Sequence, residues 1–203
     1  MKKADLHCHS KFSEHPSEWF LQRLGARESY TDPLDIYAMA KKAGMDYVTI
    51  TDHNRIEGAL KLKEKYPNDT FTGLEATTYF PEDNCKIHIL IYDISDLQFE
   101  IINHLRKDIY EFRNYLKEEQ IIHSVAHASY SVNGKLKLSH IERLILLFDH
   151  FETHNGGRSK WGNQGWRRVL DNLNDAHIGD LYTRYRIEPD RKSTRLNTSK
   201  RIR

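Results

Sequence analysis

Histidine and carboxylate residues recur where predicted strands end, and their spacing indicates metal chemistry. The first short apolar segment ends in His7-Cys8-His9. Alternate residues of a strand share one face, so His7 and His9 are expected to project together. Two imidazoles on one face could bind a transition metal, although a single His-x-His pair also occurs without one.

The same residue types follow the other predicted strands. The candidates are Asp52, His53, Glu75, His88, His123, His127, Glu152 and His154, with Glu14 five residues after His9. Singly, each has a structural alternative: Asp52 could cap a helix, and His88 could be a hydrogen-bonded core histidine. Together, imidazole and carboxylate suit Zn, Mn or Fe. Several carboxylates among several histidines predict more than one ion, and a bridging glutamate fits in-line phosphoryl displacement.

Short apolar runs alternate with amphipathic stretches, which predicts a βα-repeat fold. Strands are expected at 5–8, 47–51, 71–74, 87–92, 121–126 and 148–153. Helices are expected at 33–43, 56–66, 96–119, 138–147, 162–173 and 175–185. This repetition predicts parallel strands joined by right-handed crossovers, with functional residues at the C-terminal strand ends.

Composition indicates a soluble globular protein. The 203 residues suit one domain, and 30% of them are charged, with a formal net charge of only +2. Bulk charge therefore does not predict a phosphate-rich partner. Cys8 and Cys85 form no disulfide pattern. Neither a signal peptide nor a membrane span is visible in the sequence, so a cytoplasmic location is expected by default.

The order of these motifs resembles the PHP (polymerase and histidinol phosphatase) domain family. The resemblance covers residues 4 to about 157. The matching segments are His7-Cys8-His9-Ser10, Thr51-Asp52-His53-Asn54, Gly73-Leu74-Glu75, Ile87-His88-Ile89 and Val125-Ala126-His127. The resemblance implies an α/β fold, a distorted (β/α)7 barrel, with a di- or trinuclear metal centre.

The resemblance also implies roles for individual residues. His7, His9 and Glu75 would hold a first ion; Glu75, His88 and His127 would hold a second, with Glu75 bridging; Glu14 and His53 would hold a third. Many family members have aspartate where this chain has Glu14. Asp52 would orient an imidazole, and His154 could protonate the leaving oxygen.

The family's Gly-Ser-Asp-x-His segment near the C-terminus has no clear counterpart. Asp175-Ala176-His177 imitates it, but within a predicted helix. The barrel is therefore expected to be incomplete at its C-terminal end. We expect one metal-dependent phosphoesterase domain at 1–189 and a basic tail at 190–203. The tail resembles translated sequencing-adapter read-through, and a disordered or natural basic terminus is the alternative.

The expected activity is hydrolysis of a small phosphorylated substrate by two or three divalent ions (Zn, Mn or Fe). Arg27 and Arg158 could clamp a phosphate, and residues 17–30 could cover the site. One alternative is a non-catalytic metal-binding module that regulates an attached enzyme, such as a glycosyltransferase. A nuclease is less favoured, because only the tail is clearly basic. An amidohydrolase shares the early His-x-His motif. No membrane partner is expected, and the oligomeric state stays open.

Overall fold

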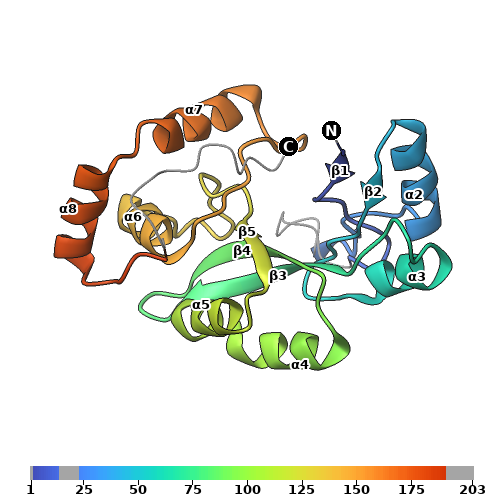
Figure 1. Ribbon diagram of the computed structural model, residues 1–203, viewed down its shortest axis with the longest axis horizontal. Coiled ribbons are helices and arrows are strands. Elements are labelled where there is room, and N and C mark those ends of the chain that lie inside the picture. The colour runs from blue at the N-terminus through green and yellow to red at the C-terminus, as the bar shows by residue number, and fades with distance from the viewer. Residues whose placement is uncertain (1, 14–22, 191–203) are drawn as a thin grey trace.

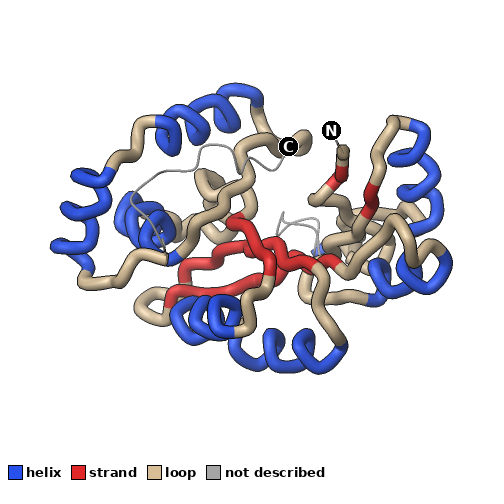
Figure 2. The backbone as a smooth tube through the Cα atoms, in the orientation of Figure 1, coloured by secondary structure: helices blue, strands red, loops and turns tan. Residues whose placement is uncertain are grey.

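A computed structural model describes residues 2–13 and 23–190. Its described strands form two separate sheets, one of two strands and one of three. Figure 2 shows the strands gathered toward the centre, with the helices outside them. This mixed α/β architecture confirms the predicted class. A closed barrel is not seen within the described ranges, so that part of the prediction is not confirmed.

The two-stranded sheet carries the N-terminal motif. β1 (Ala4–Asp5) pairs in parallel with β2 (Tyr47–Val48), as the βα pattern predicts. α2 (Pro33–Lys42) and α3 (Glu57–Lys65) lie beside this sheet (Figure 1). Asp32 caps α2 by accepting a hydrogen bond from the backbone N–H of Leu34 at 3.0 Å, and Pro33 occupies the first turn.

The three-stranded sheet is antiparallel, which corrects the prediction of parallel strands. β3 (Gly73–Phe80), β4 (Cys85–Tyr92) and β5 (Ile122–Val125) follow in that order across the sheet. β3 and β4 are joined by residues 81–84 alone. A link this short permits only a hairpin, because a parallel crossover needs a dozen residues or more. The register places Thr77 opposite His88 and Leu74 opposite Ile91.

Two helices replace the single helix predicted at 96–119. α4 (Asp96–Leu105) ends before a turn, and α5 (Ile109–Glu118) begins after Asp108. The Asp108 side chain accepts hydrogen bonds from the backbone N–H groups of Tyr110 and Glu111, so it starts a new helix. Ile102 and Phe112 are fully buried in the core that includes the apolar side chains of β3 and β4.

Three helices complete the described chain: α6 (Leu138–Leu147), α7 (Lys160–Asp171) and α8 (Asp175–Tyr185). The strand predicted at 148–153 is reduced to one parallel bridge between Phe151 and Val125. Asp175 and His177 lie exposed on α8, where the Asn174 side chain accepts a hydrogen bond from the His177 backbone N–H. None of the described helices has the length and apolar character needed to cross a bilayer.

Candidate metal centre

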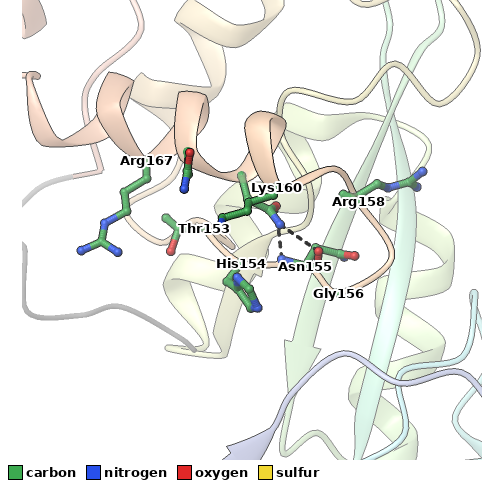
Figure 3. A pocket seen from close by; sticks show the side chains of 9 residues that line it. Thr153, His154, Asn155, Gly156, Arg158, Lys160 and Arg167 are labelled. Carbon is green, nitrogen blue, oxygen red and sulfur yellow. Dashed lines mark hydrogen bonds between the residues drawn. The ribbon is translucent and has the colours of Figure 1, made fainter.

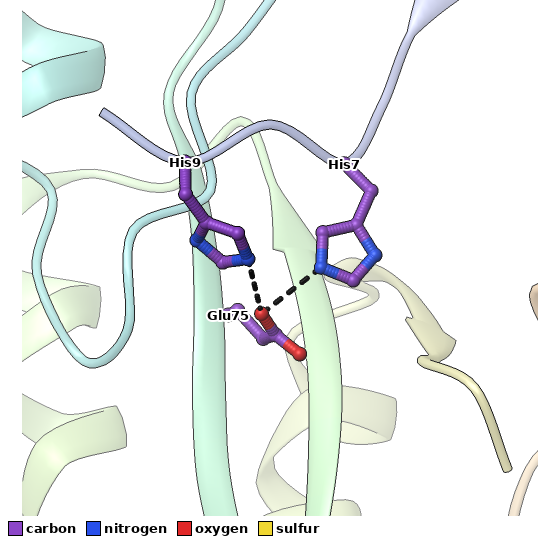
Figure 4. A group of neighbouring side chains, drawn as sticks. All are labelled: His7, His9 and Glu75. Atoms are coloured by element: carbon purple, nitrogen blue, oxygen red, sulfur yellow. Dashed lines mark hydrogen bonds and ion pairs between the residues drawn. The ribbon is translucent and has the colours of Figure 1, made fainter. Parts of the chain in front are cut away.

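Glu75 is the hub of a histidine cluster. It lies on β3, and its side chain is 0% exposed. Its Oε2 atom lies 3.0 Å from Nε2 of both His7 and His9 (Figure 4) and 3.4 Å from Nδ1 of His53. Its Oε1 atom lies 2.9 Å from Nδ1 of His88 and 3.1 Å from Nε2 of His127. Each carboxylate oxygen thus faces its own group of imidazoles.

Distant segments supply these side chains. His7 and His9 follow β1, and His53 forms a parallel β-bridge to Glu75 itself. His88 lies on β4, and His127 follows β5. The antiparallel pairing of β3, β4 and β5 therefore places residues from three strands beside one another. The structure brings together six of the seven sequence-predicted ligands, all but Glu14.

The donor atoms fit divalent ions better than they fit a hydrogen-bond network. Nδ1 of His53 and Nδ1 of His88 are buried and have no hydrogen-bond partner among residues 2–13 and 23–190. Both lie near the Glu75 carboxylate, so the distance is short but the orientation is wrong for a hydrogen bond. Buried unpaired nitrogens beside a carboxylate need another partner. Imidazole and carboxylate are the ligand types that Zn, Mn and Fe accept.

A second carboxylate, Glu28, extends the cluster. Its Oε2 atom lies 3.2 Å from Nε2 of His53 and 3.6 Å from Nδ1 of His9. The Ser13 hydroxyl donates a hydrogen bond to the same oxygen at 2.6 Å, which fixes its position. His9, Glu28 and His53 form one of three possible ligand groups, with His7, His9 and Glu75 and with His53, Glu75 and His88.

The sequence pattern did not predict Glu28, which lies beside His53, the residue that was paired with Glu14 in the predicted third site. Glu14 lies outside the described residues, so its predicted role stays a prediction. Glu28 lies in a polar stretch that follows no predicted strand. The pattern of histidines and carboxylates at strand ends therefore does not include it. The backbone hydrogen bond from Glu28 N–H to the Ser13 carbonyl, 3.3 Å long, is a tertiary contact across the loop.

Glu152 and Asn155 contact the candidate ligands and help to hold them in place. The Oε1 atom of Glu152 lies 2.9 Å from Nδ1 of His7, and its Oε2 atom accepts a hydrogen bond from the backbone N–H of His127 at 2.9 Å. The Asn155 side-chain amide lies 3.1 Å from both Glu152 oxygens and 3.3 Å from Nδ1 of His7. Metal-binding histidines commonly use such a partner to fix their tautomer.

The buried charges stabilise one another. Burial by itself raises the pKa of Glu75, but His7, His53 and His88 outweigh it and hold that pKa well below its usual range. Burial by itself lowers the pKa of His7, but Glu75 and Glu152 raise it to about 10. Burial dominates at His88 and lowers its pKa to about 4. The metal-free cluster therefore combines an ionised Glu75 with an imidazole that is neutral at His88 and protonated at His7, and a metal ion at His7 would have to displace that proton.

Asp52, predicted to orient an imidazole, and His154, predicted to protonate the leaving oxygen, lie at different places. Asp52 is buried, and its carboxylate accepts hydrogen bonds from the Ser10 backbone N–H at 2.6 Å and the Ser10 hydroxyl at 2.7 Å. It thus anchors the segment that carries His9, rather than bonding an imidazole directly. His154 is exposed and lines a surface pocket with Arg158 (Figure 3). Arg27 is exposed and donates to the Lys11 carbonyl.

Comparisons with known proteins support the fold. No family model matches the chain. An uncharacterized protein of Methanocaldococcus jannaschii is 38% identical over 79 residues, which are 37% of this chain and 44% of the relative. The match thus spans less than half of the length of that relative. An amidohydrolase from Chromobacterium violaceum, solved with sulfate and no metal, has a TM-score of 0.53 at 13% identity, covering 83% of each chain.

A proposed metal-dependent phosphoesterase from Bifidobacterium adolescentis has a TM-score of 0.50 at 14% identity, covering 92% of this chain and 85% of that one. At these identities the likeness shows a shared fold. The chain therefore has the α/β architecture of these two proteins, with a His/Glu cluster that could hold metal.

Proposed function

We propose that this chain is a metal-dependent hydrolase of the PHP type that cleaves phosphoesters. One observation carries the proposal: each oxygen of the buried Glu75 carboxylate faces a separate group of imidazoles. A carboxylate in this position is suited to bridge two divalent ions, with a third beside Glu28. The fold shared with a proposed metal-dependent phosphoesterase adds support.

The ligand assignment follows the two faces of Glu75. His7 and His9 would hold one Zn, Mn or Fe ion at Oε2, and His88 and His127 would hold another at Oε1. When bound, such ions neutralise phosphoryl charge and make water a stronger nucleophile. A small phosphorylated molecule is the proposed substrate.

The surrounding residues position these ligands and handle protons. Glu152 fixes the tautomer of His7, and the Asp52–Ser10 pair holds the segment that follows His9. We assign His154 the protonation of the leaving oxygen, because it lies one residue from Asn155, which contacts His7. An exposed imidazole exchanges protons readily with solvent.

Metal content and turnover test the proposal together. Plasma mass spectrometry on purified protein is expected to give two or three ions per chain, with hydrolysis of p-nitrophenyl phosphate. Glu75→Gln keeps the side-chain shape but loses the charge, so it should lose at least one ion and most of the turnover. Glu118→Gln, at an exposed position on α5, is the matched control. Unchanged metal content in Glu75→Gln would contradict the site.

A non-catalytic metal-binding module is the second candidate. The position of Asp175 and His177 favours it, because both are exposed on α8 rather than near Glu75. Bound metal without hydrolysis of any phosphoester offered would support this candidate over the enzyme.

A further inference from the structure

A surface pocket of about 530 Å³ is lined in part by Asn155 (Figure 3), whose side chain contacts His7 of the histidine cluster. Its walls are residues 153–156, Arg158 and four residues of α7: Lys160, Asn163, Gln164 and Arg167. The lining side chains include the cations Arg158, Lys160 and Arg167, and His154 lies among them. The described residues that line the pocket include no carboxylate, so the pocket carries a net positive charge.

Two of the cations are available to a ligand. Within the described ranges, Lys160 makes no ion pair. Arg167 has a long contact of 3.7 Å from Nε to Asp171 on its own helix, with its side chain 48% exposed. Arg158 stacks on the Tyr130 ring, 3.5 Å from guanidinium carbon to ring centroid. Figure 3 shows Arg158 turned away from Arg167, so Lys160 and Arg167 are the two cations offered to a ligand.

Asn155 connects this pocket to the metal centre. Its side chain reaches His7 and Glu152, while its backbone N–H donates to Asn163 Oδ1 at 3.3 Å. The Asn163 amide returns a hydrogen bond to the Asn155 carbonyl at 2.9 Å. The pocket wall is therefore hydrogen-bonded to Asn155, which also contacts the candidate metal ligand His7. A molecule held at the metals could extend into the pocket.

We propose that this pocket binds a phosphate-like oxyanion, and that the substrate carries such a group in addition to the phosphoester that is cleaved. Ammonium and guanidinium donors suit an oxyanion because they combine charge with N–H groups. The statement about the substrate rests on the proposed function, whereas anion binding in the pocket does not.

Binding of inorganic phosphate tests the pocket directly. Isothermal titration of the purified protein is compared with Lys160→Ala, Lys160→Ala/Arg167→Ala and Arg168→Ala, all at equal metal content. Arg168 is the matched control, because it is exposed on the same helix but outside the pocket. We expect the double variant to lose at least about tenfold in affinity for one phosphate, the single variant less, and Arg168→Ala less than twofold. Equal affinity in the double variant, or an equal loss in Arg168→Ala, would overturn the proposal.

Turnover tests the substrate class separately. Alkanediol bisphosphates of increasing length are compared with the matching alkyl monophosphates. For the best length, kcat/KM should exceed that of the monophosphate by about tenfold or more, and the double variant should lose this preference while it still cleaves monophosphates. No preference at any length would overturn the substrate class. Absence of all turnover with intact phosphate binding would instead reject the proposed function and leave the anion pocket standing.

Discussion

The two ring nitrogens of His7 contact different carboxylates: Nε2 lies 3.0 Å from Glu75 Oε2, and Nδ1 lies 2.9 Å from Glu152 Oε1. The His7 imidazole thus links Glu75, at the centre of the cluster, to Glu152. If Nδ1–H donates to Glu152, the Nε2 lone pair is left for a metal ion at Glu75.

Removing Glu152 should weaken metal binding without removing a ligand. We expect Glu152→Ala to reduce metal affinity by about 10–100-fold, because His7 loses the partner that fixes its tautomer. Glu152→Gln should lose less, since its amide oxygen can still accept from His7. Affinity measured by competition with a chromophoric chelator checks this, with Glu118→Ala as the control. Equal affinities for Glu152→Ala and the control would show that Glu152 does not position His7.

Glu28 should be needed for one ion only. Its carboxylate contacts His9 and His53 but lies outside the His88–His127 side of the cluster. Glu28→Ala is therefore expected to lower the metal content by about one ion per chain and to leave the Glu75 ions in place. Plasma mass spectrometry measures the change. Glu14→Ala is the informative comparison: a loss of metal there, with none in Glu28→Ala, would support the ligand role predicted for Glu14 and contradict the one proposed for Glu28.

Gly58 should tolerate no side chain. A Cβ atom at this position of α3 would lie 2.4 Å from Asp52 Oδ2 and 2.8 Å from Ser10 Oγ. Asp52 is buried and bonded twice to Ser10, so it has little room to move. We expect Gly58→Ala to destabilise the protein by about 1–3 kcal/mol in urea unfolding.

Gly165 provides the control for Gly58. It lies inside α7, and a Cβ atom there would meet nothing within 4 Å. Gly165→Ala should stabilise the protein by about 0.5–1 kcal/mol, because alanine favours the helix. If Gly58→Ala were as stable as Gly165→Ala, the close contact between α3 and the Asp52–Ser10 pair would be wrong.

Metal uptake should release protons at neutral pH. In the metal-free protein, burial opposes protonation of His7, but Glu75 and Glu152 raise its pKa to about 10. A metal ion at this ring must displace that proton, so apparent affinity should rise about tenfold per pH unit between pH 7 and 9. Titration calorimetry in buffers of different ionisation enthalpy counts the protons. Uptake without proton release would contradict the raised pKa.

The raised pKa of His7 also makes the stability of the metal-free protein depend on pH. The unshifted pKa of histidine is 6.5, and the folded value for His7 is about 10. The proton on His7 therefore stabilises the metal-free fold fully below pH 6.5, and this contribution is lost as the pH rises toward 10. Thermal unfolding of chelator-treated protein should show a lower melting temperature at pH 10 than at pH 7.

Several helices could be predicted because their signals are local. Residues 138–147 and 175–185 are helical as expected, and Asp32 with Pro33 starts the helix at 33–42. These signals are periodicity, caps and turns, which act over a few residues. The break at Asp108 is also local, but the long apolar stripe obscured it, and the predicted helix at 96–119 is in fact two.

Strand pairing could not be predicted in the same way. The short link between Phe80 and Cys85 gives a hairpin, and the strand predicted at 71–74 continues to Phe80. Fully buried strands carry apolar residues on both faces, so their pattern does not distinguish parallel from antiparallel neighbours. The alternation of strands and helices predicted parallel pairing, and tertiary packing of the described chain gave an antiparallel sheet instead.

The sequence by itself determined the mixed α/β class and six histidine and glutamate side chains that meet, because residue type and position after a strand are local properties. The family resemblance already implied that Glu75 is shared between two groups of ligands. The tertiary structure decided the contacts around it: Glu28 beside His53, and Glu152 beside His7. Glu152 is 145 residues from His7 along the chain. Contacts of that kind depend on how the whole chain packs, and no periodicity or motif spacing encodes them.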